Sequence, residues 1–222
     1  MTKLDDTPLG QLRYVANISW PRSGHHMLVG LCRNYFGSDF HYCEFYNKDI
    51  DCCRKFPCAR QNKIVMSKNH DHKLDILLDD ASPILIQIRS FKPSVVSNYE
   101  LAVKNGREDS FKSFVNFATH YQNQYKPFYK KWITSDFDNE RLIVRYEDIT
   151  KNPETIFSDV LRFIAPGIVV DVNRVQEAIE NVNKVTVEKS VPIVQKKSGV
   201  NNTRNIEQFR HYNEDFFSTL ID

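Results

Sequence analysis

Short, nearly continuous apolar runs alternate along this chain with longer stretches in which apolar residues recur at helical spacing. The short runs lie at residues 12–19, 63–67, 83–88 and 142–146, and each predicts a β-strand. The run at 83–88 is typical of a strand in a parallel sheet whose two faces are both covered. We therefore expect helices on both sides of such a sheet.

The longer stretches predict the helices and where they begin. Pro93 opens one helix, and Asn152 with Pro153 opens another. The predicted helices cover residues 24–35, 93–104, 110–132, 153–164 and 171–182. This alternation predicts an α/β fold, a three-layer sandwich around a central, mainly parallel sheet with a P-loop-like strand-loop-helix near its start.

Two segments lack a clean period. Residues 36–60 are rich in aromatic residues, cysteine and charge, and we interpret them as an irregular excursion, either an acceptor-binding insertion or a lid. Residues 189–205 are polar and basic, and we interpret them as a loop that could fold over a ligand.

Composition limits the possible partners. With 222 residues, 41% of them hydrophobic, a single domain over residues 1–222 is expected. A formal charge of +2 indicates neither nucleic acid nor a membrane as a partner, so any anion site must be local. Residues 1–10 do not resemble a signal peptide, and no apolar run approaches a membrane span. We expect a soluble protein of the cytoplasm.

All five cysteines lie between Cys32 and Cys58. The clustering is compatible with a zinc site, a local disulfide or reduced structural thiols. The spacing is poor for zinc, because there is no C-x-x-C pair and the adjacent Cys52 and Cys53 cannot easily bind one tetrahedral ion together. Reduced thiols are the favoured interpretation, and no metal is expected.

The segment between the first predicted strand and helix reads Ser19-Trp20-Pro21-Arg22-Ser23-Gly24-His25-His26. A tight turn there presents backbone N–H groups and the positive end of a helix to an anion, to which Arg22 adds charge and Ser23 a hydroxyl. The G-x-x-x-x-G-K-[ST] pattern of ATP-binding P-loops is absent. We interpret the segment as a phosphate or sulfate site, with a simple polar turn as the alternative.

Polar residues also follow the second and third predicted strands, as Lys68-Asn69-His70 and Arg89-Ser90. Ligands of open α/β sheets bind beyond the carboxyl ends of the strands. These residues and Ser19 are therefore expected to converge on one crevice.

Four segments match, in order and spacing, the motifs of one enzyme superfamily. Trp20-Pro21-Arg22-Ser23-Gly24 is similar to a 5′-phosphosulfate loop that usually reads Tyr-Pro-Lys-Ser-Gly, and Lys68-Asn69-His70 to a Lys-Thr-His segment with a catalytic base. Arg89, with Ser97 eight residues later, is similar to a 3′-phosphate motif, and Tyr146-Glu147-Asp148 to a Tyr-Glu-Asp near the adenine. Over residues 13–165 the chain thus resembles the sulfotransferases that use 3′-phosphoadenosine-5′-phosphosulfate (PAPS).

The resemblance implies three catalytic residues. His70 would be the general base that removes the acceptor proton, with His72 as its rival. Arg22 would stabilise charge on the leaving phosphate. Lys68 would assist at the sulfuryl group, unless it is a solvated lysine at a strand end.

The resemblance also implies a donor site without a metal. The backbone N–H groups of residues 23–26 would hold the 5′-phosphate. Arg89 and Ser97 would bind the 3′-phosphate, unless Arg89 pairs with an acidic neighbour and Ser97 faces solvent. Tyr146 would stack on adenine or else belong to the core. The implied donor-binding residues are Arg22, Ser23, Gly24, His25, His26, Arg89, Ser97, Tyr146 and Lys197.

This chain departs from the family pattern at several positions. Arg22 stands where lysine is usual, which keeps the charge but changes its reach. His25 and His26 replace two threonines, so their imidazoles are candidate donors in place of hydroxyls. Lys196 and Lys197 only approximate an Arg-Lys-Gly clamp.

The resemblance implies transfer of the PAPS sulfuryl group to a hydroxyl or amine of a small-molecule or saccharide acceptor. Aromatic residues in 40–56 could line the acceptor pocket or simply pack the excursion against the core. The alternatives are a catalytically silent protein that binds 3′-phosphoadenosine nucleotides and an ATP-dependent phosphotransferase. The missing Gly-Lys-Ser/Thr signature counts against the latter.

Overall fold

Five parallel strands form the centre of this protein, as seen in a computed structural model that describes residues 11–46, 53–77, 82–136, 138–188, 200 and 205–221, with only the backbone for 185–188. The strand order is β2-β3-β1-β4-β5. The strands are β1 (Val15–Ser19), β2 (Tyr42–Glu44), β3 (Met66–Asn69), β4 (Ile84–Ile88) and β5 (Arg141–Arg145).

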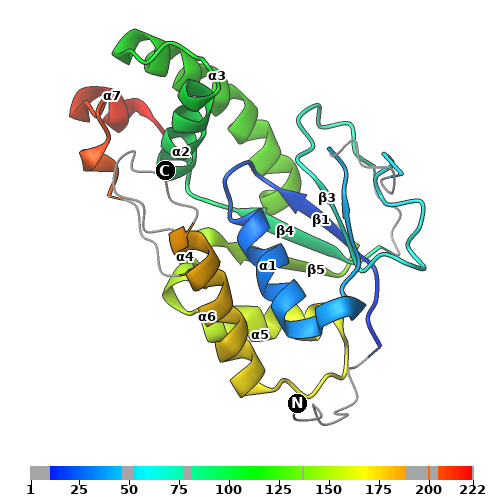
Figure 1. Cartoon of the computed structure of the whole chain (residues 1–222). Coiled ribbons are helices and arrows are strands. Elements are labelled where there is room, and N and C mark those ends of the chain that lie inside the picture. The colour runs from blue at the N-terminus through cyan, green and yellow to red at the C-terminus, as the bar shows by residue number, and fades with distance from the viewer. Residues whose placement is uncertain are drawn as a thin grey trace.

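Helices cover both faces of the sheet (Figure 1). Their bounds are α1 (His25–Phe36), α2 (Phe91–Lys104), α3 (Phe111–Tyr129), α4 (Tyr146–Lys151), α5 (Pro153–Ile164), α6 (Val172–Glu188) and α7 (Glu214–Thr219). Short helical turns η1 (Gly37–Asp39), η2 (Lys130–Thr134) and η3 (Ile206–Gln208) complete the fold, and η2 continues α3 as a π-helical segment. Within the described part of the chain, no helix is long and apolar enough to cross a membrane.

The pairing register brings the strand ends together. In β1, Ile18 lies opposite Asn69 of β3 and Ile86 of β4. Every residue of β1 and β4 is buried, as expected for central strands covered on two faces. Because all the strands are parallel, the residues that follow them meet at the carboxyl edge of the sheet.

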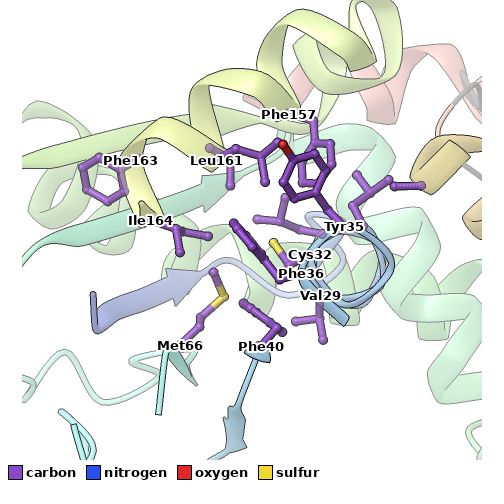
Figure 2. Close-up of a cluster of buried hydrophobic side chains, with 14 of the residues drawn as sticks. Val29, Cys32, Tyr35, Phe36, Phe40, Met66, Phe157, Leu161, Phe163 and Ile164 are labelled. Carbon is purple, nitrogen blue, oxygen red and sulfur yellow. The ribbon is translucent and has the colours of Figure 1, made fainter. Parts of the chain in front are cut away.

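Two apolar cores lie on opposite faces of the sheet. On one face, α1, α5 and α6 pack together, and Figure 2 shows Tyr35 beside Phe157, with their ring centroids 6.0 Å apart. On the other face, α2 and α3 pack over Ile18, Ile86 and Ile88. The expected three-layer α/β sandwich with a parallel sheet is therefore confirmed.

The predicted elements are all present, with shifted ends, and three others were missed. The strand predicted at 63–67 runs from Met66 to Asn69, so Lys68 and Asn69 belong to the strand itself. Tyr146 begins α4 rather than ending β5. The missed elements are β2, α4 and α7, each six residues long or shorter. Segments this short carry too little periodic signal to be found.

Candidate active site

The loop between β1 and α1 is held rigidly at the carboxyl edge of the sheet. Trp20 is buried, its ring lies edge-on at 5.0 Å from the rings of Tyr121 and Tyr125, and its indole N–H donates to Ser94 Oγ at 3.2 Å. Arg22 and Gly24 both have positive φ, at 66° and 82°. The backbone therefore makes a tight turn directly before α1.

This turn has the properties of an anion site. Gly24 is the N-cap of α1, and no side chain in the described part of the chain caps that helix end. Ser23 is buried, and its Oγ has no hydrogen-bond partner among the described residues. A buried hydroxyl without a partner is costly, and a phosphate oxygen would satisfy it together with the N–H groups of the helix start. The residues here thus fit a phosphate or sulfate group.

The structure brings the predicted 3′-phosphate residues to this loop. Arg22 Nε donates to Ser97 Oγ at 3.0 Å, although 75 residues separate them. Arg89 Nη1 donates to the backbone oxygen of Arg22 at 3.4 Å. Ser97 is 8% exposed, so the alternative in which it faces solvent is wrong.

Tyr146 lies on the other side of the same cluster. The guanidinium carbon of Arg89 is 4.1 Å from the centroid of the Tyr146 ring, a cation–π contact. A Cβ added at Gly24 would lie 2.8 Å from Cδ2 of Tyr146. Gly24 is therefore required both for its positive φ and for the close approach of this ring. Tyr146 is half-buried and so remains a candidate for contact with a base.

His70 follows β3 and faces the end of β1. Its Nδ1 is 2.5 Å from the backbone oxygen of Ser19 and 3.2 Å from Ser19 Oγ. Because a carbonyl oxygen only accepts, Nδ1 carries the proton, and Nε2 of the neutral ring keeps its lone pair. Burial, with the charge of Lys68, lowers the pKa of His70 to about 3. The ring is therefore neutral at pH 7, as a proton acceptor must be.

Residues that the sequence analysis did not single out hold His70 in place. The Tyr46 ring stacks on the His70 ring at 5.2 Å with an interplanar angle of 19°, and its hydroxyl donates to Asn69 Oδ1 at 2.9 Å. The Tyr46 hydroxyl also accepts the backbone N–H of His70 at 2.9 Å. The rival His72 lies 5.3 Å from His70, ring to ring, and Tyr46 is tilted against it.

The turn after His70 is fixed by a buried carboxylate. Asp71 has positive φ, and its side chain is fully buried. Its Oδ2 accepts from Lys131 Nζ at 2.7 Å and from the indole N–H of Trp132 at 2.9 Å. Both donors lie in η2, so the π-helical end of α3 positions the turn that carries His70.

Lys68 is buried in an ion pair. Its Nζ donates to Glu44 Oε1 at 3.0 Å, and the lysine side chain is 6% exposed. The alternative in which Lys68 is a solvated lysine is therefore wrong. Burial alone would raise the pKa of Glu44, but hydrogen bonds from Tyr42 and Lys68 outweigh it and lower that pKa. Sequence analysis missed Glu44, which lies in the excursion that showed no period.

The two histidines of the loop differ. The His25 ring is buried, with Nδ1 2.9 Å from Asn17 Oδ1 and Nε2 2.5 Å from the Tyr42 hydroxyl. Burial, with Lys68 nearby, holds the pKa of His25 well below its usual value. Its imidazole is therefore not a replacement donor toward a ligand, which corrects the sequence-based expectation for that ring. His26 is exposed and can still act in that way.

The predicted C-terminal loop and the aromatic excursion have different outcomes. Lys197, and the loop 189–205 apart from residues 200 and 205, lie outside the described residues. A cavity of about 1040 Å³ lies beside β2 and is lined in part by His26, Tyr42 and Glu44. Phe40 is buried in the core, so packing is the correct interpretation for this aromatic residue of the excursion.

Comparison with solved structures identifies the architecture. A crystal structure of mouse sulfotransferase SULT7A1 complexed with PAP superimposes with a TM-score of 0.55, over 94% of this chain and 79% of the mouse chain. The two proteins share a fold. The sequences are only 11% identical, so the similarity concerns the fold alone. No protein-family model matches the sequence, and no curated protein matches it.

Proposed function

We propose that this protein is a sulfotransferase that takes the sulfuryl group from PAPS. The observation that carries the proposal is the convergence of the β1–α1 loop, the Arg22–Ser97–Arg89 cluster and His70 at one edge of the sheet. The shared fold with a sulfotransferase complexed with PAP supports it.

The donor nucleotide would bind along the strand ends. The helix start at Gly24 and the partnerless Ser23 hydroxyl would hold its 5′-phosphate. Arg89 and Ser97 would bind its 3′-phosphate, and the Tyr146 ring would lie against the base. When bound, PAPS supplies an activated sulfuryl group with a phosphate as its leaving group.

His70 would remove the acceptor proton. Its Nε2 has the free lone pair, because the Ser19 carbonyl fixes the proton on Nδ1. A negatively charged ligand beside the ring would raise its pKa from about 3 toward the range of an effective base. Base catalysis of this kind contributes roughly 10²–10⁴-fold. Arg22, at the loop, would stabilise charge on the leaving phosphate.

The acceptor would be a hydroxyl or amine of a small molecule or saccharide. The cavity beside β2 is lined in part by His26, Tyr42 and Glu44, and Glu44 is the partner of Lys68. Lys68 would assist at the sulfuryl group only after it leaves Glu44, because that carboxylate now neutralises its charge.

The first test is calorimetric titration with adenosine 3′,5′-bisphosphate (PAP), beside ADP and 5′-AMP. Binding that depends on the 3′-phosphate is expected, and Arg89→Ala should weaken PAP at least about ten-fold more than 5′-AMP. Arg162→Ala, which removes a surface arginine of α5, serves as the control and should change neither. Equal affinity for PAP and 5′-AMP in the wild-type protein would refute the donor site, and turnover of ATP with Mg²⁺ would instead support a phosphotransferase.

A second candidate function is binding of 3′-phosphoadenosine nucleotides without transfer. Two contacts favour it, because they occupy groups that the predicted transfer would use. Glu44 neutralises Lys68, and the His25 ring points inward to the Tyr42 hydroxyl. Transfer of labelled sulfate from PAPS to a panel of alcohols, phenols, amines and sugars distinguishes the two. In an active enzyme, His70→Ala should nearly abolish transfer while PAP binding persists, and unchanged transfer would exclude His70 as the base.

A further inference from the structure

Three cysteines meet at one point beside β2. Cys43 lies on the strand, and Cys53 and Cys58 come from the segment that follows it. All three sulfur atoms lie within 4.8 Å of one another, and the Cys53 and Cys58 sulfurs are 3.4 Å apart. Sequence spacing concealed the cluster, because Cys43 and Cys53 are ten residues apart in the chain.

The spacing of these sulfurs suits a tetrahedral metal site. With Zn–S bonds of about 2.3 Å, two sulfurs on one tetrahedral zinc ion lie about 3.8 Å apart. The 3.4 Å pair is close to that separation, and a pair at the 4.8 Å limit needs to close by about 1 Å. Cys43 and Cys58 are buried, and Cys53 is partly exposed, so the cluster can be reached from one side.

The backbone around the cluster is arranged to support thiolates. The N–H of Ala59 donates to Cys53 Sγ at 3.4 Å, and the N–H of Arg60 donates to Cys58 Sγ at 3.4 Å. Such N–H bonds stabilise the charged form of sulfur, which is the form that binds metals. The N–H of Cys58 donates to the Tyr14 hydroxyl at 2.8 Å, which ties this segment to the start of β1.

We propose that Cys43, Cys53 and Cys58 bind a zinc ion, with water as the fourth ligand. Cys43 and Arg60 line the cavity beside β2, which gives water access to the cluster. The site is separate from the proposed donor chemistry, and its test does not depend on sulfuryl transfer. It replaces the expectation that these cysteines are reduced thiols without a metal.

The zinc would fix the segment that faces His70. Glu44, the partner of Lys68, directly follows Cys43, and Tyr46, which stacks on His70, lies two residues further on. Metal binding at Cys43 therefore anchors the end of β2 from which both side chains extend. A disulfide between Cys53 and Cys58 would leave Cys43 outside the bond and would not anchor β2.

The test begins with the wild-type protein. Reduced protein is incubated with zinc chloride and desalted, and zinc is then measured by atomic emission. About one equivalent per chain is expected, with a rise in Tm that a chelator reverses. Substitution by Co²⁺ should give the thiolate charge-transfer absorption and the d–d bands of a tetrahedral site. Retention of no metal, or a Cys53–Cys58 disulfide by mass spectrometry of the protein as purified, would overturn the proposal.

Variants assign the ligands. Cys43→Ser, Cys53→Ser and Cys58→Ser should each weaken zinc binding by at least about 100-fold. Cys32→Ala is the matched control, because Cys32 is buried in the core of α1 and is not part of the cluster. It should keep the metal. If Cys43→Ser binds zinc as tightly as the wild type, the three-thiolate site is wrong, and circular dichroism of each variant separates loss of metal from loss of fold.

Discussion

Replacing Gly24 by alanine tests whether the turn before α1 binds the nucleotide. Gly24 has a φ of 82°, and a Cβ there would lie 2.8 Å from Tyr146 Cδ2 and 3.1 Å from Met27 Cε. Carbon atoms in contact prefer about 3.5–4.0 Å, so the Tyr146 ring must move by roughly 0.7 Å or more. That ring carries the Arg89 guanidinium on its face, so the substitution should displace both.

The magnitude follows from two contributions. A non-glycine residue at this φ costs about 1–2 kcal/mol, and forced overpacking adds about 1–3 kcal/mol. For a chain of this size each kcal/mol lowers Tm by about 2–4 °C. Gly24→Ala should therefore lower Tm by roughly 4–20 °C and weaken PAP binding at least about ten-fold.

Gly167→Ala is the matched control. Its φ is 84°, close to that of Gly24, but no atom of the described residues outside its neighbours lies within 4 Å of the added Cβ. It should show only the backbone cost, about 2–8 °C in Tm, and unchanged PAP affinity. Thermal melts and calorimetry with PAP on both variants provide the comparison. Equal losses of Tm, with PAP affinity preserved in Gly24→Ala, would refute the proposed contact among the loop, Tyr146 and the nucleotide.

Three further predictions concern the side chains around His70. Asp71→Ala leaves the buried indole N–H of Trp132 and the partly exposed Lys131 without their acceptor and should cost about 1–3 kcal/mol in urea unfolding. Asp71→Asn keeps an acceptor oxygen and should cost less, and equal costs would contradict a hydrogen-bonding role for Asp71. The pKa of His70 is about 3 in the folded protein and about 6.5 in the unfolded one, so its contribution to stability is present above pH 6.5 and is lost as pH falls toward 3. Tm should therefore fall over this range, and His70→Asn should reduce that fall. An unchanged dependence of Tm on pH in the variant would contradict the burial of the ring. Glu44→Gln should cost about 1–3 kcal/mol, and Lys68→Met in the same background should recover part of it, whereas additive losses would show that the ion pair is not coupled.

The central sheet could be predicted because its strands are buried on both faces. β4 is apolar except for Gln87, and β1 carries apolar residues at three of its five positions, so the pattern locates both strands. β2 is different, since Tyr42, Cys43 and Glu44 alternate between partly exposed and buried positions over three residues. Three residues of alternation are too few to separate an edge strand from a loop. The described residues of 36–60 are therefore mostly irregular, as predicted, apart from β2, which carries Glu44.

The residues of the candidate site also differ in whether the sequence predicts their positions. Arg89 and His70 could be predicted because each follows a strand, where the parallel topology brings residues together, and Arg22 lies in the loop after β1. Ser97 was indicated only by the resemblance to a 3′-phosphate motif. Tyr46 and Glu44 could not, because their contacts with His70 and Lys68 depend on how an aperiodic segment folds back over β3.

Cys43, Cys53 and Cys58 lie close in the chain to Glu44 and Tyr46. The proposed zinc site and the proposed active site therefore share one segment. A strand of three residues buries too little apolar area to fix a catalytic partner to within a hydrogen-bond distance by itself. Glu44 nevertheless contacts Lys68 at 3.0 Å, and Tyr46 accepts the His70 N–H at 2.9 Å. The parallel pairing of β2 with β3 already places Glu44 opposite Lys68, and a metal bound at Cys43 would further fix the end of this short strand. Removal of zinc should thus weaken the Tyr46–His70 contact before it affects the β1–α1 loop, since that loop is held independently by Trp20.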